Sequence, residues 1–418
     1  MKKTLLVRSY KLILSTALLF FVFPVLAQDA ENEEKPKLKL GGALRFNYNL
    51  SSWKDGQKDR GGDFGYDMFR VNAEGSYKNI FLNVEYRLYS EAFGGGFLKQ
   101  GWMGYKINKE DQIQVGLTQV PFGLQQYNSH NWFFNLTYYV GLEDDHDMGI
   151  KYIHDSDRIQ YQLAFFKNAE ELQFGSTTET DPSRYSYDIT GRNKEINQFN
   201  GKFIYKLGKD RQHQLGTSVQ YGGIYNLDTK ETGNHHGFAL HYEYLGEKWN
   251  VKAQGMIIDH NLKTPDTISD KVLQFGAYGA NYGLAAKFNM YSLAVSRSIP
   301  VEIGPISNLE FYNDFGFMDK AEKDFEDSYM NVTGVLITAG NVYTYIDYAA
   351  GYNHSWLGGN FVDDFSVGNP DAKFSSNGFP TGGGLWGRRV PRGRLGTRNK
   401  SRWRGRELLL ILLFLTSR

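Results

Sequence analysis

The sequence contains no cysteine in its 418 residues, and this absence excludes two classes of exported protein. A chain of this size without cysteine is not a disulfide scaffold, so a sheet or a core must stabilise it. It is not a bacterial lipoprotein either, because that class needs a cysteine after its cleavage site. Long apolar runs are also scarce. After residue 27 none reaches the roughly 20 residues of a membrane-spanning helix.

The N-terminus has the pattern of a secretory signal peptide. Four basic residues precede an apolar run from Leu12 to Leu26, and the small residue Ala27 follows. We expect residues 1–27 to be cleaved near Ala27, leaving a short periplasmic segment at 28–36. The alternative is an N-terminal membrane anchor, which is less favoured because the run is shorter than a spanning helix and polar residues follow it.

The net charge of +1 hides an uneven distribution. Residues 1–27 carry four basic residues and no acid, and residues 388–418 carry ten basic residues against one acid, Glu407. The residues between them are therefore acidic. An acidic body does not bind nucleic acid through its overall charge, so we expect no nucleic-acid partner.

The composition and its alternation indicate β-structure. Aromatic residues make up 15% of the chain, glycine occurs 46 times and the mean hydropathy is −0.48, which suits an all-β envelope protein. In Leu38–Leu50 the even positions are apolar except Gly42, and the odd positions include Lys39 and Arg45. Successive side chains of a strand point to opposite faces, so this stretch predicts a strand with one apolar and one polar face.

Similar two-faced segments recur, and the connections between them alternate between short and long. This asymmetry is typical of outer-membrane barrels. The pattern yields fifteen strands, with the twelfth near Val272–Leu284 and an interruption of the alternation at 285–307. A single-chain barrel of this class has an even number of strands. We therefore predict an all-β fold, an antiparallel transmembrane β-barrel of 16 strands within 37–384, whose last strand is missing.

Four segments resemble the phosphate-selective porin O and P family of outer-membrane porins. They are Phe69–Tyr89, Val115–Leu124, Asn131–Tyr152 and Met330–Gly358. The resemblance covers Leu38–Ser375 and implies a trimeric sixteen-stranded barrel whose third outer loop folds inward to narrow the pore. By its order and length that loop is 118–147. The family's arginine ladder and lysine cluster have no matching motif positions in this sequence.

The C-terminal residues 385–418 break the barrel pattern. They do not alternate, they contain an arginine cluster, and they end in Arg418 rather than in the terminal aromatic residue that the barrel insertion machinery reads. We hypothesise that translation leaves the ancestral frame near Leu385, which would replace the sixteenth strand and leave the edge of the first unpaired. Reading the other frames of the gene tests this idea. Binding of the basic tail to anionic lipid or nucleic acid is the weaker alternative.

The polar faces of the strands predict the pore lining. Their basic residues outnumber their acidic ones by a modest margin. The candidate anion-binding residues, which would act through their local field, are Arg45, Arg70, Arg87, Lys151 and Lys202. The alternative interpretation is a polar lining whose opposite charges pair across neighbouring strands.

No catalytic site, cofactor site or metal site follows from the sequence. The acidic cluster Glu143–Asp147 lacks the spaced oxygens of a Ca²⁺-binding loop, so we expect it to be solvated loop charge or to share divalent ions with lipopolysaccharide. The residues predict a passive outer-membrane porin for small hydrophilic solutes, with a preference for anions or phosphate as the finer expectation. Its other partners would be outer-membrane lipid and lipopolysaccharide. The alternative is a barrel enzyme, a lipase or protease, which needs a Ser/His or Asp/His pair near one rim.

Overall fold

The computed structural model describes residues 35–51, 55–125, 127–170, 178–323, 325–357 and 406–417, the last of these as backbone. The chain divides into two compact units, Met1–Lys37 and Leu38–Arg418, and the second contains nearly all of the regular structure. In the part of the chain that is described, no helix combines the length and the apolar character needed to cross a membrane.

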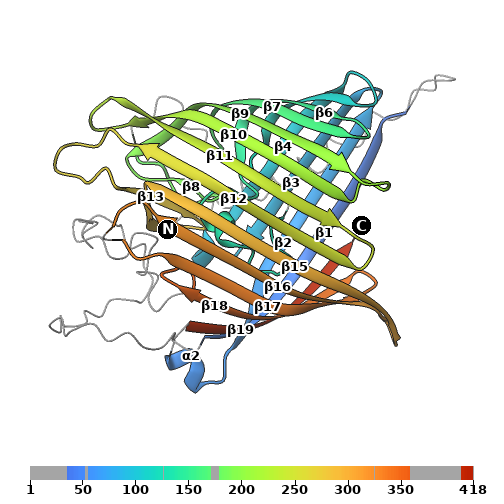
Figure 1. The fold of residues 1–418 in the computed structure, drawn as a ribbon. Helices are drawn as coiled ribbons and strands as arrows, with labels where there is room; N and C mark the ends of the chain where they lie inside the picture. Colours follow the sequence, from blue (N-terminus) through green and yellow to red (C-terminus); the bar gives the residue numbers. More distant parts are fainter. Residues whose placement is uncertain are drawn as a thin grey trace, which may run out of the picture. The chain divides into compact units, whose positions relative to one another are not determined.

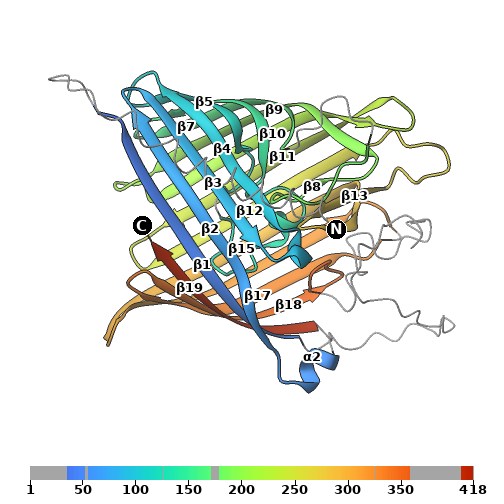
Figure 2. The ribbon, with the colours of Figure 1, turned by 180° about the vertical axis from the view of Figure 1, so that it is seen from behind.

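Sixteen antiparallel strands form a closed barrel, in the order β1-β2-β3-β4-β5-β6-β7-β9-β10-β11-β12-β15-β16-β17-β18-β19 and back to β1 (Figures 1 and 2). Their bounds are β1 (Lys37–Ser51), β2 (Asp63–Tyr77), β3 (Ile80–Tyr89), β4 (Gly96–Lys106), β5 (Asp111–Gln119), β6 (His146–Asp155), β7 (Ile159–Ala169), β9 (Asn193–Leu207), β10 (His213–Asn226), β11 (Thr232–Leu245), β12 (Trp249–Asn261), β15 (Lys287–Ile303), β16 (Ile306–Lys320), β17 (Ser328–Ala339), β18 (Val342–Tyr352) and β19 (Arg406–Ser417). The predicted fold class, an antiparallel β-barrel, is confirmed.

The barrel wall buries its polar face and exposes its apolar face. On β1, Ala43, Arg45 and Asn47 are buried, whereas the intervening Leu44 and Phe46 remain partly exposed. The same inversion holds around the wall. Exposed apolar side chains include Val71, Leu163, Phe203, Val219, Leu240, Ile257, Leu293 and Phe311. Because strand side chains alternate between faces, the buried polar residues point into the barrel and the apolar ones point outward.

The connections alternate in length as the sequence predicted. At one end of the strands they are short, at residues 78–79, 107–110, 156–158, 208–212, 246–248, 304–305 and 340–341. Gly304 and Gly340 have positive φ angles of 56° and 59°, which glycine adopts without a Cβ clash in tight hairpins. The connections at the other end are mostly longer and contain three short helical segments. These are α2 (Asp55–Asp59), the 3₁₀ segment η1 (Glu91–Phe93) and α3 (Leu136–Tyr139).

The prediction that Val272–Leu284 forms the twelfth strand of the barrel was wrong. Residues 272–285 form the hairpin β13 (Val272–Ala277) and β14 (Ala280–Ala285), and β13 also pairs with β8 (Asp188–Ile189) in a separate three-stranded sheet. The hairpin is buried on both faces, so its apolar residues meet protein and not lipid. The twelfth strand of the wall is β15, and its turn to β16 is short. The interruption of the short and long connections that we predicted at 285–307 is therefore absent from the barrel wall.

The predicted gap in the barrel is filled. β19 lies between β18 and β1 and pairs with both, from Gly42↔Ser417 to Ser51↔Leu408 on the β1 side (Figure 2). The expectations of a missing last strand and an unpaired first edge were therefore wrong. They failed because residues 408–415 are continuously apolar, whereas pairing depends on backbone N–H and C=O groups rather than on alternation. The proposed change of frame near Leu385 falls outside the described residues and stays a hypothesis.

Interrupting β19 should prevent the barrel from closing. Ile411 pairs with Tyr48 of β1 and Ile346 of β18, so the substitution Ile411→Pro removes a backbone donor between two strands. After refolding into detergent micelles, we expect most of the variant to lack a closed barrel. Limited trypsin digestion would measure the lost protease resistance, and circular dichroism would measure the lost β-structure. Ile411→Val is the matched control. A proline variant as resistant as the control would contradict the role of β19.

Candidate functional site

The loop between β5 and β6, residues 120–145, crosses the interior of the barrel. Its partners include inward-facing side chains of β10, β12, β16 and β18, which lie far from β5 and β6 around the wall. The bonds run from Gly123 N to Ser218 Oγ (3.1 Å), Leu124 N to Gln254 Oε1 (3.0 Å), His130 N to Asp314 Oδ2 (2.7 Å) and Trp132 N to Asp347 Oδ2 (3.1 Å). This loop, named the crossing loop below, lies within the segment 118–147 that the sequence singled out.

The two lysines among the five candidate anion-binding residues donate to the crossing loop or its edge. Lys151 Nζ donates to the Gln119 carbonyl at 2.7 Å, and Lys202 Nζ donates to Gln125 Oε1 at 2.9 Å. Lys252, on β12, donates to two loop carbonyls in the same way. The amines are directed at fixed oxygens of the protein, so these lysines position the loop against the wall.

Arg45 lies at one end of the loop's path. It forms an ion pair with Asp67 of β2, and its guanidinium carbon lies 5.1 Å from the ring centre of Trp132 in the crossing loop. A cation over an indole face is attracted by the ring quadrupole, typically by about 0.5–2 kcal/mol. Arg45 thus holds Trp132 while its own charge is paired with a carboxylate.

Arg70 and Arg87 share the carboxylate of Glu85. Arg87 Nε lies 2.6 Å from Glu85 Oε1, and Arg70 Nη1 lies 3.9 Å from Glu85 Oε2. Arg87 also donates to the Tyr185 hydroxyl at 3.1 Å. The structure therefore places the three candidate arginines on neighbouring strands β1, β2 and β3, each with a carboxylate partner. This is the cross-strand pairing that the alternative interpretation described.

Lys99 of β4, which the sequence analysis did not single out, forms a fully buried ion pair with the crossing loop. Its Nζ lies 2.7 Å from Asp144 Oδ2, and the two side chains are 3% and 0% exposed. The Tyr185 hydroxyl donates to the same oxygen at 2.7 Å. Burial acts to raise the pKa of Asp144, but Lys99, His146 and Arg87 outweigh it and lower the pKa to about 2. Asp144 is therefore ionised inside the barrel.

The expectation that Glu143–Asp147 is solvated was wrong. Glu143, Asp144 and Asp147 are all buried. Glu143 accepts hydrogen bonds from Asn128 N at 2.8 Å and Thr137 Oγ1 at 2.6 Å, and burial raises its pKa to about 8. The cluster looks like loop charge in the sequence because solvent exposure depends on where the loop turns, which charge spacing does not reveal.

Several connections share one hydrophobic cluster inside the barrel. They include the crossing loop, residues 178–192 and residues 262–286. Members of the cluster include Phe133, Leu136, Tyr139, Ile189, Leu273, Phe275 and Leu284. Each fully buried side chain of this size contributes about 1.5–3 kcal/mol relative to an exposed one. The interior at this level is therefore packed, except where this cluster leaves space.

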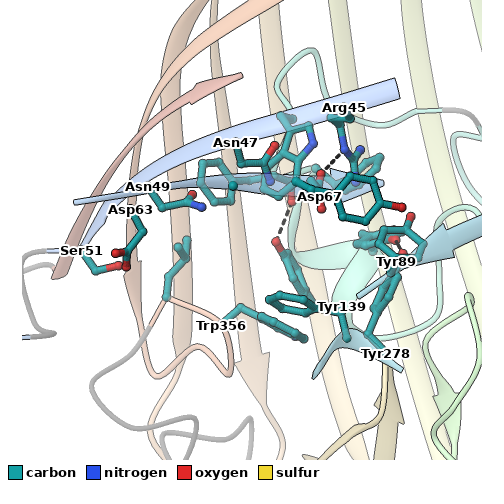
Figure 3. Close-up of a pocket in the computed structure, with 18 of the residues that line it drawn as sticks. Arg45, Asn47, Asn49, Ser51, Asp63, Asp67, Tyr89, Tyr139, Tyr278 and Trp356 are labelled. Carbon is teal, nitrogen blue, oxygen red and sulfur yellow. Dashed lines mark hydrogen bonds and ion pairs between the residues drawn. The ribbon is translucent and has the colours of Figure 1, made fainter. Parts of the chain in front are cut away.

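That space is a cavity of about 430 Å³ between the packed loops and strands β1 to β3 (Figure 3). One side is polar and consists of wall residues. The other is aromatic and comes from the loops. The polar residues include Arg45, Asn47, Asn49, Ser51, Asp63 and Asp67, and the aromatic residues include Trp132, Tyr138, Tyr139, Tyr187, Tyr278 and Trp356. Strand alternation pointed to Arg45 from the sequence, and the aromatic density of Asn131–Tyr152 could have pointed to part of the aromatic lining.

A serine and a histidine meet inside the barrel, as the alternative enzyme hypothesis requires. Ser218 Oγ lies 3.4 Å from His241 Nε2. The crossing loop covers this serine, since Gly123 N donates to its oxygen and the residue is 1% exposed. Within the described ranges no carboxylate contacts His241 to orient it, so the pair lacks the third member that activates a nucleophile.

Removing the amine of Lys99 should strongly destabilise the protein, because the buried Asp144 carboxylate then loses its ion-pair partner at 2.7 Å. We expect Lys99→Met to lower the free energy of unfolding by about 3–5 kcal/mol, measured by guanidinium denaturation of the refolded barrel. Adding Asp144→Asn should recover most of the loss, since the uncompensated charge is then gone.

Lys206→Met is the matched control for Lys99→Met, because its partner Asp155 is half exposed. We expect a loss of no more than about 1 kcal/mol there. Equal losses in both lysine variants would contradict a special role for the buried pair.

Comparisons of the sequence with protein-family models and with curated proteins find no match. Solved structures share the fold. OmpF of Salmonella typhi in complex with daunomycin has a TM-score of 0.55 and 11% identity, covering 91% of this chain and 97% of that chain. The outer membrane channel DcaP of Acinetobacter baumannii has a TM-score of 0.54 and 8% identity, covering 93% and 100%. An anion-selective porin from Comamonas acidovorans has a TM-score of 0.53 and 9% identity, covering 92% and 100%. At these identities the likeness shows a shared fold alone.

Proposed function

We propose that this protein is an outer-membrane porin through which small hydrophilic solutes diffuse passively. The observation that carries the proposal is the closed barrel with an apolar outer face, a polar inner face and a cavity beside the crossing loop. Sixteen strands enclose more space than their own side chains fill, as in porins. Several structures of the same fold are channels or porins. The covered Ser218 and His241 pair favours transport over hydrolysis.

The cavity is the narrow part of the proposed path. A solute there would meet the polar side chains of β1 and β2 on one side and the aromatic rings of the loops on the other (Figure 3). Rings next to hydroxyl, amide and charged groups suit solutes that have both an apolar face and hydrogen-bonding groups. The crossing loop therefore limits the size of solute, and the strand residues contribute its polar contacts.

We also propose that the porin has a weak preference for anions. Arg45 and Arg87 line the cavity, but each has a carboxylate partner, so the field they present to a solute is weak. Lys151 and Lys202 face the crossing loop instead of the cavity. Selectivity for phosphate, as in the phosphate-selective porin O and P family, would require these cations to exchange partners when an anion enters.

The proposed processing, membrane insertion and assembly are those expected from the sequence. We propose cleavage near Ala27, insertion of the barrel into the outer membrane by the barrel insertion machinery, and assembly into a homotrimer. The apolar outward face supports a lipid environment, where lipopolysaccharide would contact its outer half. Crosslinking of the folded protein in detergent tests the trimer directly.

Conductance across planar bilayers tests the function. We expect the refolded protein to form discrete channels whose permeability ratio of chloride to potassium slightly exceeds one. Arg45→Gln leaves the Asp67 carboxylate without its arginine beside the cavity, so the chloride-to-potassium ratio should fall by about two- to fivefold. This corresponds to a change of roughly 0.4–1 kcal/mol in the relative free energies of the two ions in the channel. The reversal potential in a salt gradient measures this change.

Arg211→Gln is the control for Arg45→Gln. Arg211 pairs with Asp157 among the short turns, away from the cavity, so the ratio should not move. A correctly folded barrel that never conducts would overturn the porin proposal. Conductance that Arg45→Gln leaves unchanged, with equal currents in chloride and phosphate, would overturn only the anion preference.

A further inference from the structure

Three carboxylates from distant parts of the chain meet between the barrel wall and the inner sheet. Asp147 lies at the start of β6, Asp188 on β8 and Glu195 on β9. One oxygen of each lies within 4.8 Å of the others. None of the three lines the cavity, so the cluster is distinct from the proposed solute path.

Further carboxylates surround the cluster, and few of the described basic groups do. Asp145 and Glu170 lie close enough to interact with it, and His235 Nδ1 lies 3.9 Å from Glu195 Oε1. Arg184 pairs with Asp188 at 2.5 Å and with Glu170 at 3.3 Å. Among the described contacts, one guanidinium thus faces several carboxylates in a buried site, where like charges repel strongly.

One oxygen of the cluster has no hydrogen-bond partner in the part of the chain that the structure describes. It is Oδ1 of Asp147, a residue only 1% exposed. A buried carboxylate oxygen without a donor is costly, and buried polar atoms in folded proteins are nearly always satisfied. A bound cation would supply both the missing partner and the missing positive charge.

The geometry points to calcium. We infer that Asp147, Asp188 and Glu195 bind one Ca²⁺ ion. Carboxylate oxygens are the ligands that hard divalent cations prefer. Ca²⁺ takes about six to eight oxygen ligands in a flexible geometry, whereas Mg²⁺ usually keeps several waters and is held by one or two carboxylates. Three carboxylates whose oxygens all lie within 4.8 Å of one another therefore suit Ca²⁺. Water and backbone carbonyls would complete the coordination.

Such an ion would fasten the inner sheet to the barrel. Asp147 and Glu195 belong to wall strands, and Asp188 belongs to the sheet formed by β8, β13 and β14. Asp147 also lies two residues beyond the crossing loop. One Ca²⁺ would therefore fix the position of the inner sheet and of the loop's C-terminal end at the same time. This inference holds whether or not the barrel conducts solutes.

Calorimetry on the full chain tests the inference. The protein is refolded into detergent without lipopolysaccharide, treated with EDTA, dialysed and titrated with CaCl₂ and then with MgCl₂. We expect one Ca²⁺ per chain, weaker binding of Mg²⁺, and a higher melting temperature with Ca²⁺ than with EDTA. No heat and no shift with Ca²⁺, or tighter binding of Mg²⁺ than of Ca²⁺, would overturn the assignment.

A pair of matched variants locates the site. Asp147→Asn should weaken Ca²⁺ binding by about tenfold or more. In EDTA its melting temperature should be no lower than that of the parent, because the substitution removes one repelling charge. Asp155→Asn, the same change at the other end of β6, should bind like the parent. If Asp147→Asn does not fold, Glu195→Gln replaces it with the same expectation. An equal calcium response in both folded variants would overturn the site.

Discussion

The constraint on which the whole structure depends is that no strand edge can stay unpaired in a lipid environment. Water is absent there, so each free N–H or C=O group would cost several kcal/mol. The pairing of β19 with β1 and β18 meets this requirement by closing the ring. Closure then fixes which face of each strand points inward, and thereby places Arg45, Lys99 and Lys202 inside the barrel.

Once closed, the barrel has a polar interior whose donors and charges need partners, and the loops supply many of them. Lys99 meets Asp144, Lys151 and Lys202 meet oxygens on or beside the crossing loop, and Arg87 meets Tyr185. These contacts hold the loops so that their apolar residues pack together at the centre. The interior thus has charged contacts at its circumference and a hydrophobic cluster in the middle, with the cavity left between the cluster and β1 to β3.

This arrangement explains why a basic pore lining need not give strong anion selectivity. A lysine that donates to a backbone carbonyl, or an arginine paired with Asp67 or Glu85, presents less of its charge to a passing solute than a free one would. Under the proposed porin function, selectivity would then depend on the geometry of the cavity, where aromatic rings face polar strand residues. The carboxylates near Asp147 differ, because the described contacts leave them with excess charge.

The sequence by itself determined the class of fold and most of its wall. Alternation in segments such as Leu38–Leu50, with alternately short and long connections, is a local consequence of strands between lipid and a polar interior, so it could be predicted. The loop 118–147 was found by its order and length, and Arg45 and Arg87 by their strand positions. Only the tertiary structure showed that Val272–Ala285 lies inside the barrel, that β19 closes it, that Glu143–Asp147 is buried and that Asp188 meets Asp147. Each of these depends on contacts between segments distant in the chain, which leave no periodic signal in the sequence.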